Sequence, residues 1–101
     1  MKKHRRLNSV RVLGKDFKLR YETEGNLELQ DYGHMKYTKL EIAIRDGMPK
    51  QLEQDTLMHE LIHAIEVQTD LNLSEAQVRT LGCGIVQVLA DNPELAKFLI
   101  S

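Results

Sequence analysis

Residues 51–68 contain neither glycine nor proline, and from residue 57 onward their apolar side chains recur around most of a helical circumference. This pattern predicts an α-helix that is buried on more than one side. The apolar positions are Leu57, Met58, Leu61, Ile62, Ala64 and Ile65. Within this segment His59 and His63 stand four residues apart, and Glu60 follows the first histidine. Because an α-helix has about 3.6 residues per turn, both imidazoles fall on one helix face.

Two imidazoles on one face can bind one metal ion, and ionisable side chains carry a desolvation cost if they are buried without such a partner. Metal-assisted hydrolysis requires protein ligands, an open coordination position and a general base. Glu60 lies about 100° around the helix from His59, so it can reach a water on the metal without binding the metal itself. We therefore predict a Zn²⁺ ion on His59 and His63, with Glu60 as the catalytic general base. The alternative is a pair of core histidines bonded to neighbouring carbonyl groups.

A catalytic zinc site usually has three protein ligands and a water, so a third ligand is expected after His63. Glu66 shares the helix face but lies too far along the axis to converge with both histidines, and we expect it to be solvated or to orient His63. Asp70 has a short side chain at the helix end and is expected in a turn. Glu75 begins the next predicted helix after a chain reversal, so it can face the histidines from a second element. We predict Glu75 as the third ligand; the alternative is a first-turn glutamate that complements the helix dipole.

The second predicted helix contains two glycines, Gly82 and Gly84, each of which costs about 1 kcal/mol relative to alanine. Because they lack side chains, we expect them to let this helix approach the motif helix closely. Cys83 lies between them and is expected to be a small core residue, since attack by water requires no nucleophilic side chain.

The first half of the chain predicts β-strands. Residues 9–13 and 17–21 alternate apolar and charged side chains around a turn at 14–16, which indicates a hairpin. After a second turn, apolar residues alternate between positions 27 and 32. Residues 40–45 form the clearest half-buried strand. One face of that strand carries Leu40, Ile42 and Ile44.

The second half predicts helices. The motif helix spans residues 49–69 and begins at a proline, whose missing N–H is not needed in a first turn. Ser74 is a predicted N-cap with Gln77 in the reciprocal capping position, and it opens a second helix that ends near residue 90. A short last helix ends near residue 99. The apolar stripe of the second helix consists of Val78, Leu81, Ile85, Val88 and Leu89. Strands followed by helices predict an α+β fold, and we expect one domain over residues 1–101.

The chain has a formal net charge of −1 and 42% hydrophobic residues, as in an ordinary globular domain. Residues 1–6 are basic but lack aromatic interleaving and a DNA-binding motif, so we expect a solvated tail and no nucleic-acid partner. The alternative is an arm that steers a nucleic-acid-associated protease. No apolar run is long enough for a membrane span or a secretory signal. A single cysteine fits a reducing, cytoplasmic setting.

Residues 56–65, 73–75, 78–81 and 86–93 resemble the very short HExxH zinc metallopeptidase-like proteins encoded by bacteriophages and bacteria, of minimal gluzincin type. The chain is more loosely similar to the ImmA/IrrE and SprT-like peptidase domains. The resemblance covers residues 37–99 well and the N-terminal strands weakly. It implies a zincin-like fold, in which a small twisted sheet packs on the active-site helix and a glutamate-bearing helix follows.

By this resemblance, His59 and His63 match the family's histidine ligands, Glu60 its general base and Glu75 its third ligand. The eleven residues between His63 and Glu75 are fewer than in most gluzincins. The resemblance implies a zinc-dependent peptidase that acts on a peptide or protein substrate.

A peptidase also needs an electrophile for the oxyanion of the tetrahedral intermediate. Tyr32, His34 and Tyr37 are candidates because their segment precedes the strand that leads into the motif helix. By analogy with zincin-like folds, that strand, residues 40–45, is expected to hold an extended peptide by edge pairing. The alternative function is a zinc-stabilised protein-interaction module with little turnover, in which the metal joins the two long helices.

Overall fold

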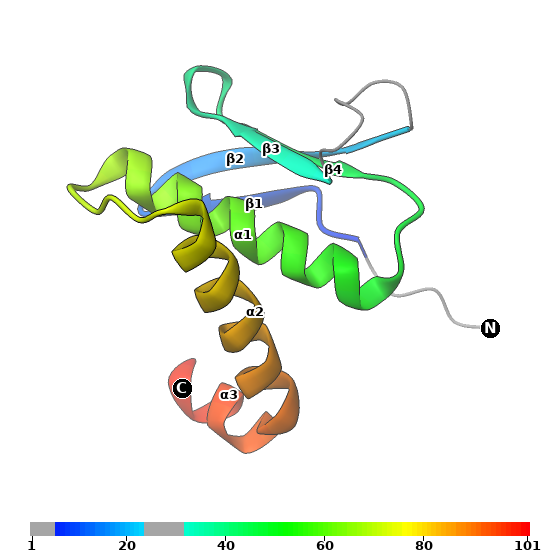
Figure 1. The fold of residues 1–101 in the computed structure, drawn as a ribbon, viewed down its shortest axis with the longest axis vertical. Coiled ribbons are helices and arrows are strands. Elements are labelled where there is room, and N and C mark those ends of the chain that lie inside the picture. The colour runs from blue at the N-terminus through cyan, green and yellow to red at the C-terminus, as the bar shows by residue number, and fades with distance from the viewer. Residues whose placement is uncertain (1–5, 24–31) are drawn as a thin grey trace.

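The computed structural model describes residues 6–23 and 32–101 as a four-stranded sheet followed by three α-helices (Figure 1). The strands are β1 (Ser9–Val12), β2 (Lys15–Glu22), β3 (Gly33–Lys36) and β4 (Glu41–Arg45), and a 3₁₀ turn, η1 (Tyr37–Lys39), precedes β4. The helices are α1 (Lys50–Gln68), α2 (Glu75–Asp91) and α3 (Pro93–Leu99). The predicted α+β class is confirmed. Within the described ranges, no helix has both the length and the apolar character needed to cross a membrane.

β1 and β2 form the predicted antiparallel hairpin, in which Val12 pairs with Lys15. The turn consists of Leu13 and Gly14, with φ angles of 49° and 82°. Two consecutive positive φ angles suit the tight turns that match the twist of paired strands. The turn is therefore shorter than the one predicted at residues 14–16, and Lys15 already belongs to β2.

β4 lies inside the sheet, whose strand order is β1-β2-β4-β3. It runs parallel to β2 and antiparallel to β3. The prediction that residues 40–45 offer a free edge to a peptide is therefore wrong, because both sides of β4 are paired within the sheet. The outer strand beside it is β3, which was not predicted from the sequence. Of the alternating positions predicted at 27–32, all but Tyr32 lie outside the described residues.

β4 begins at Glu41, one residue later than predicted, because Leu40 follows η1 in a left-handed conformation with φ of 50°. Ile42 and Ile44 are fully buried, as the predicted alternation requires. Ala43, on the opposite face, is buried as well. The centre of β4 is therefore covered on both faces and is not half-buried.

The core lies between the sheet and one face of α1. Phe17 and Leu19 from β2, with Ile42 and Ile44 from β4, form one buried cluster with Ala64 of α1. Complete burial of a large apolar side chain contributes roughly 1.5–3 kcal/mol. This layer therefore holds the motif helix firmly against the sheet.

α2 covers a second side of α1 and then runs away from the sheet (Figure 1). The predicted capping box opens α2. The Ser74 hydroxyl accepts a hydrogen bond from the Gln77 backbone N–H at 3.1 Å, and Gln77 Oε1 accepts one from the Ser74 N–H at 2.9 Å. The box satisfies two backbone donors at the helix start and so fixes Glu75 as the first residue of α2.

The apolar stripe predicted for the second helix is mostly uncovered. Val78 is fully buried against the body of the protein, whereas Leu81, Ile85 and Val88 are between 41% and 48% exposed. The physical reason is that α1 lies against the beginning of α2, while the end of α2 carries α3 and projects beyond α1 (Figure 1).

Arg6 does not belong to a free tail. Its guanidinium pairs with Asp46 and lies over the Tyr21 ring, 4.3 Å from the ring centroid. The hydrogen bond between Arg6 and Asp46 raises the pKa of Arg6 and lowers that of Asp46. The predicted basic tail over residues 1–6 is thus anchored at Arg6, which remains exposed, and residues 1–5 lie outside the described part of the chain.

Gly33, the first residue of β3, allows the outer strand to lie directly against α1. A Cβ atom here would come within 2.8 Å of the Ala43 carbonyl oxygen and within 2.8 Å of Thr56 Cγ2. Thr56 is buried on α1, one turn before the motif. This role of Gly33 was missed in the sequence, because the contact joins segments that are distant along the chain.

We expect Gly33→Ala to lower the free energy of unfolding by about 1–3 kcal/mol, because the added methyl group has no room beside a backbone oxygen. Urea unfolding followed by circular dichroism measures the change. Gly82→Ala is the matched control: its Cβ would meet His59 N at 3.6 Å, an ordinary contact, and alanine favours a helix interior by about 1 kcal/mol. A Gly33→Ala protein as stable as the unmodified chain would contradict the packing argument.

Candidate metal centre

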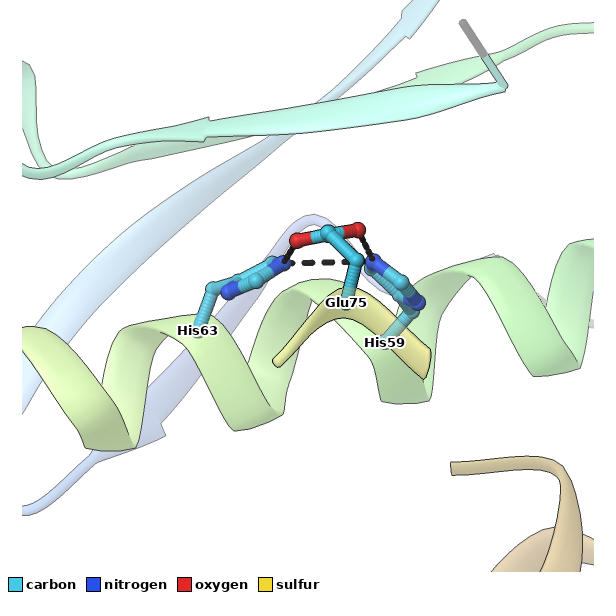
Figure 2. A group of neighbouring side chains, drawn as sticks. All are labelled: His59, His63 and Glu75. Atoms are coloured by element: carbon cyan, nitrogen blue, oxygen red, sulfur yellow. Dashed lines mark hydrogen bonds and ion pairs between the residues drawn. The ribbon is translucent and has the colours of Figure 1, made fainter. Parts of the chain in front are cut away.

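His59 and His63 lie one turn apart on α1, and their side chains converge. The ring centroids are 4.8 Å apart and the ring planes are inclined at 71°. The two Nε2 atoms are 3.2 Å apart, so both nitrogens face the same point above the helix (Figure 2). The spacing in the sequence therefore places the two rings as predicted.

Glu75 reaches this point from the first turn of α2. Its Oε2 lies 3.2 Å from His59 Nε2, and its Oε1 lies 2.9 Å from His63 Nε2. The carboxylate thus faces both imidazoles at once, as Figure 2 shows. The chain reversal between the helices brings Glu75 to the histidines, as the sequence predicted.

The distances in this group suit a metal ion. One ligand atom from each of His59, His63 and Glu75 can be chosen so that all lie within 4.8 Å of one another. Ligands bonded at about 2.0–2.1 Å in tetrahedral geometry are roughly 3.3 Å apart, and the two histidine Nε2 atoms are 3.2 Å apart. The two oxygens of Glu75 lie at 3.2 Å and 2.9 Å, one from each of these nitrogens. Two nitrogens and one carboxylate oxygen are donors that Zn²⁺ accepts. The group could therefore hold a metal ion.

Glu66 contacts His63 from behind and does not join the ligand group. Its Oε1 is 2.8 Å from His63 Nδ1, and its Oε2 accepts a hydrogen bond from the Leu73 N–H at 2.7 Å. The Leu73 N–H, and to a lesser degree His63, hold the pKa of Glu66 below its usual value. An ionised carboxylate only accepts hydrogen bonds, so Glu66 would favour the tautomer in which His63 donates from Nδ1, which leaves Nε2 to a metal when one is bound.

The Glu66 contact with Leu73 was not foreseen from the sequence. Of the two roles considered for Glu66, the structure shows the contact that orients His63. The same carboxylate also ties down the segment that enters α2, two residues before Glu75. Asp70, the other acidic residue after the motif, is not a member of the ligand group among the described residues.

Glu60 is buried beside the metal-binding group, with 6% of its surface exposed. It does not belong to the group that could hold the ion, yet it lines the same cleft as His59, His63 and Glu75. This is the placement expected of a residue that acts next to a metal without binding it.

The site opens into a cleft of about 950 Å³. Its walls come from α1, from residues 32–35 at the outer strand β3, from the α1–α2 connection and from the beginning of α2. A cleft of this size suits a segment of a larger molecule or a small ligand. The group of His59, His63 and Glu75 is therefore accessible from outside.

The three candidates for the oxyanion electrophile separate in the structure. Tyr32 and His34 line the cleft, whereas Tyr37 is not among its lining residues. The Tyr37 ring packs instead on the core, with its centroid 6.4 Å from that of Phe17. The structure thus leaves Tyr32 and His34 as candidates.

Of the two glycines of α2, only Gly82 lies against the motif helix, as was predicted for both. Gly82 is buried and faces the His59 backbone, but a Cβ atom would fit there, and at Gly84 a Cβ atom would meet nothing within 4 Å in the described chain. Cys83 is exposed and lines the cleft, so its prediction as a core residue is wrong. Local desolvation, followed by the neighbouring Asp55, raises the pKa of the Cys83 thiol and disfavours the nucleophilic thiolate.

Comparison of the chain with protein-family models, with curated proteins and with solved structures finds no match. The geometry of the described residues therefore carries the functional argument.

We expect Glu75→Ala to weaken zinc binding more than tenfold, because it removes one of three ligands and leaves two imidazoles on one helix. Competition titration against a chromophoric zinc chelator measures the affinity. Glu94→Ala, an exposed first-turn glutamate of α3, is the matched control and should bind zinc as the unmodified chain does. Equal zinc affinity of the Glu75 and Glu94 variants would refute the ligand assignment.

We expect Glu66→Ala to weaken zinc binding by about 10–100-fold, since it removes the partner that orients His63 and anchors the connection to α2. Glu66→Gln should lose less, because an amide oxygen can still accept one of the two hydrogen bonds. The same chelator titration ranks the variants. If Glu66→Ala binds zinc at least as tightly as Glu66→Gln, the orienting role is wrong.

Proposed function

We propose that this protein is a zinc-dependent peptidase with a zincin-like arrangement. The observation that carries the proposal is the convergence of two histidines from α1 and a carboxylate from α2 in an open cleft, with the buried Glu60 beside them. The order of sheet, motif helix and glutamate-bearing helix is the order that the sequence resemblance implies. Among the described residues the group has three members, which leaves a fourth tetrahedral position for solvent or substrate.

In this proposal Glu60 is the catalytic general base. A divalent ion, when bound, would make a water more acidic and polarise the carbonyl of the scissile bond. Glu60 would accept the proton of the attacking water and pass it to the leaving amine. Only 6% of the surface of Glu60 is exposed, and burial strengthens the electrostatic interactions of a charged group.

The substrate in this proposal is an extended peptide held along β3. β3 is the outer strand of the sheet, and its residues form one wall of the cleft. An outer strand offers unpaired backbone groups that can add a peptide strand. Tyr32 and His34 lie on the same wall and are the candidate donors to the oxyanion.

A second candidate function is a zinc-stabilised interaction module. The observation in its favour is that the site joins two helices, with both histidines on α1 and the glutamate on α2. A metal at this position would cross-link them and stabilise the fold whether or not turnover occurs. A peptidase needs a coordination position at which solvent exchanges for substrate, and its activity depends on Glu60. An interaction module needs neither.

We expect Glu60→Gln to abolish zinc-dependent cleavage of an unstructured protein such as casein while zinc remains bound. The amide keeps the shape of the side chain but cannot accept the proton of the water, and loss of a general base lowers the rate by about 10²–10⁴-fold. Cleavage is followed by mass spectrometry, and metal content by atomic absorption.

Glu41→Gln serves as the control for this experiment, because Glu41 lies on the sheet in a surface pair with Arg20 and does not line the cleft. It should cleave as the unmodified chain does. Cleavage by Glu60→Gln at the rate of Glu41→Gln would exclude Glu60 as the base. If the unmodified chain binds zinc and gains thermal stability from it but cleaves nothing, the interaction module is favoured.

A further inference from the structure

The end of α2 and all of α3 form a projection that we call the helical arm, residues 81–100 (Figure 1). α3 has seven residues and none of them is buried, although short helices are marginal in water without packing. Seven large apolar side chains of the arm are between 38% and 86% exposed. They are Leu81, Ile85, Val88, Leu95, Phe98, Leu99 and Ile100.

The exposed apolar area of the arm is large enough for a stable protein interface. From their exposed fractions, the seven residues leave about 700 Å² uncovered in total, spread over the end of α2 and over α3. A standard interface takes roughly 800 Å² from each partner. An area of this size matches one half of an ordinary dimer interface.

The outward stripe of α2 is approximately symmetric in apolar and polar character about its middle, with Leu81 and Val88 at equal distances from the midpoint, which favours a second copy of this chain as the partner. In an antiparallel pair of α2 helices with a two-fold axis between residues 84 and 85, Leu81 of each copy would face Val88 of the other. Polar residues, Gln77 and Asn92, lie one turn further out at each end and would also face each other. A two-fold interface requires such self-complementarity, whereas an unrelated partner does not.

Gly84 and the charge pattern fit the same arrangement. Under this symmetry Ile85 of one copy falls on Gly84 of the other, where the described chain leaves open space around a missing side chain. A glycine at this helix interior costs about 1 kcal/mol, and close approach of a second helix gives it a purpose. From residue 80 to residue 90 the sequence contains no Asp, Glu, Lys or Arg, so two identical faces would not repel each other.

We propose that the chain forms a two-fold symmetric dimer through antiparallel pairing of the α2 stripes, with the α3 side chains extending the interface. Glu75 lies in the first turn of α2, away from the proposed axis between residues 84 and 85. Cys83, which lines the cleft, lies about 200° around the helix from Leu81 and from Ile85, so the pairing uses the face opposite to the cleft. The dimer is independent of the proposed peptidase activity.

Sedimentation velocity and light scattering of the full chain test the dimer over protein concentrations from about 1 to about 200 µM. We expect twice the chain mass of 11.6 kDa. Leu81→Glu alone and Val88→Lys alone should each be monomeric, because each places charges in an apolar interface. Their equimolar mixture should regain the dimer mass. In the mixed dimer the introduced carboxylate of one variant would face the introduced ammonium group of the other, while the unmodified Val88 and Leu81 meet on the second side.

Leu7→Glu is the control, because Leu7 is also half exposed but lies beside the sheet, where its carbonyl accepts a hydrogen bond from Tyr21, and the arm projects away from the sheet (Figure 1). It should stay dimeric, and circular dichroism should show every variant folded, since the altered side chains are exposed. A chain that is monomeric at all concentrations overturns the proposal. So does a dimer that survives both arm variants, or a mixture of the two that stays monomeric.

Discussion

The carboxylate of Glu75 faces the imidazole nitrogens of both His59 and His63, and the rest of the site depends on this contact between two helices. Two histidines on one helix approach the ion from one side only, so the third ligand has to come from another element. The connection between the helices is held where Glu66 accepts the Leu73 N–H, and the capping box then sets the first turn of α2. Local hydrogen bonds in a short connection thus control a geometry on which metal binding would depend.

The two halves of α2 meet different physical demands. The first turns pack on α1, with Val78 fully buried, and present a polar carboxylate to the histidines. The later turns are apolar on a face that the described chain leaves uncovered, as Ile85 and Val88 show. One helix can present a ligand at its beginning and an apolar face at its end, because side chains on separate turns do not compete for the same space. A metal at one end and a second helix at the other would each stabilise an element that is weakly covered in the single chain.

The elements that were predicted well are those in which local chemistry decides. The β1–β2 hairpin, the capping box of Ser74 and Gln77, and the motif helix all depend on residues within a few positions of one another. The prediction failed for β3 and for the stripe of α2. A short strand that contains glycine shows little alternation of apolar and polar residues. An apolar helix stripe has the same sequence pattern whether it faces a core, a partner or water.

The sequence by itself determined which side chains could gather around an ion, because a spacing of four residues on a helix places His59 and His63 together in any fold that keeps the helix. Tertiary structure alone decided that Gly33 admits the outer strand against α1, that β4 is enclosed, and that Arg6 is anchored on Asp46. The contacts of Gly33 with α1, of β2 with β4 and of Arg6 with Asp46 each join residues more than twenty positions apart. Such pairings arise from packing of whole elements, and no local pattern of residues encodes them.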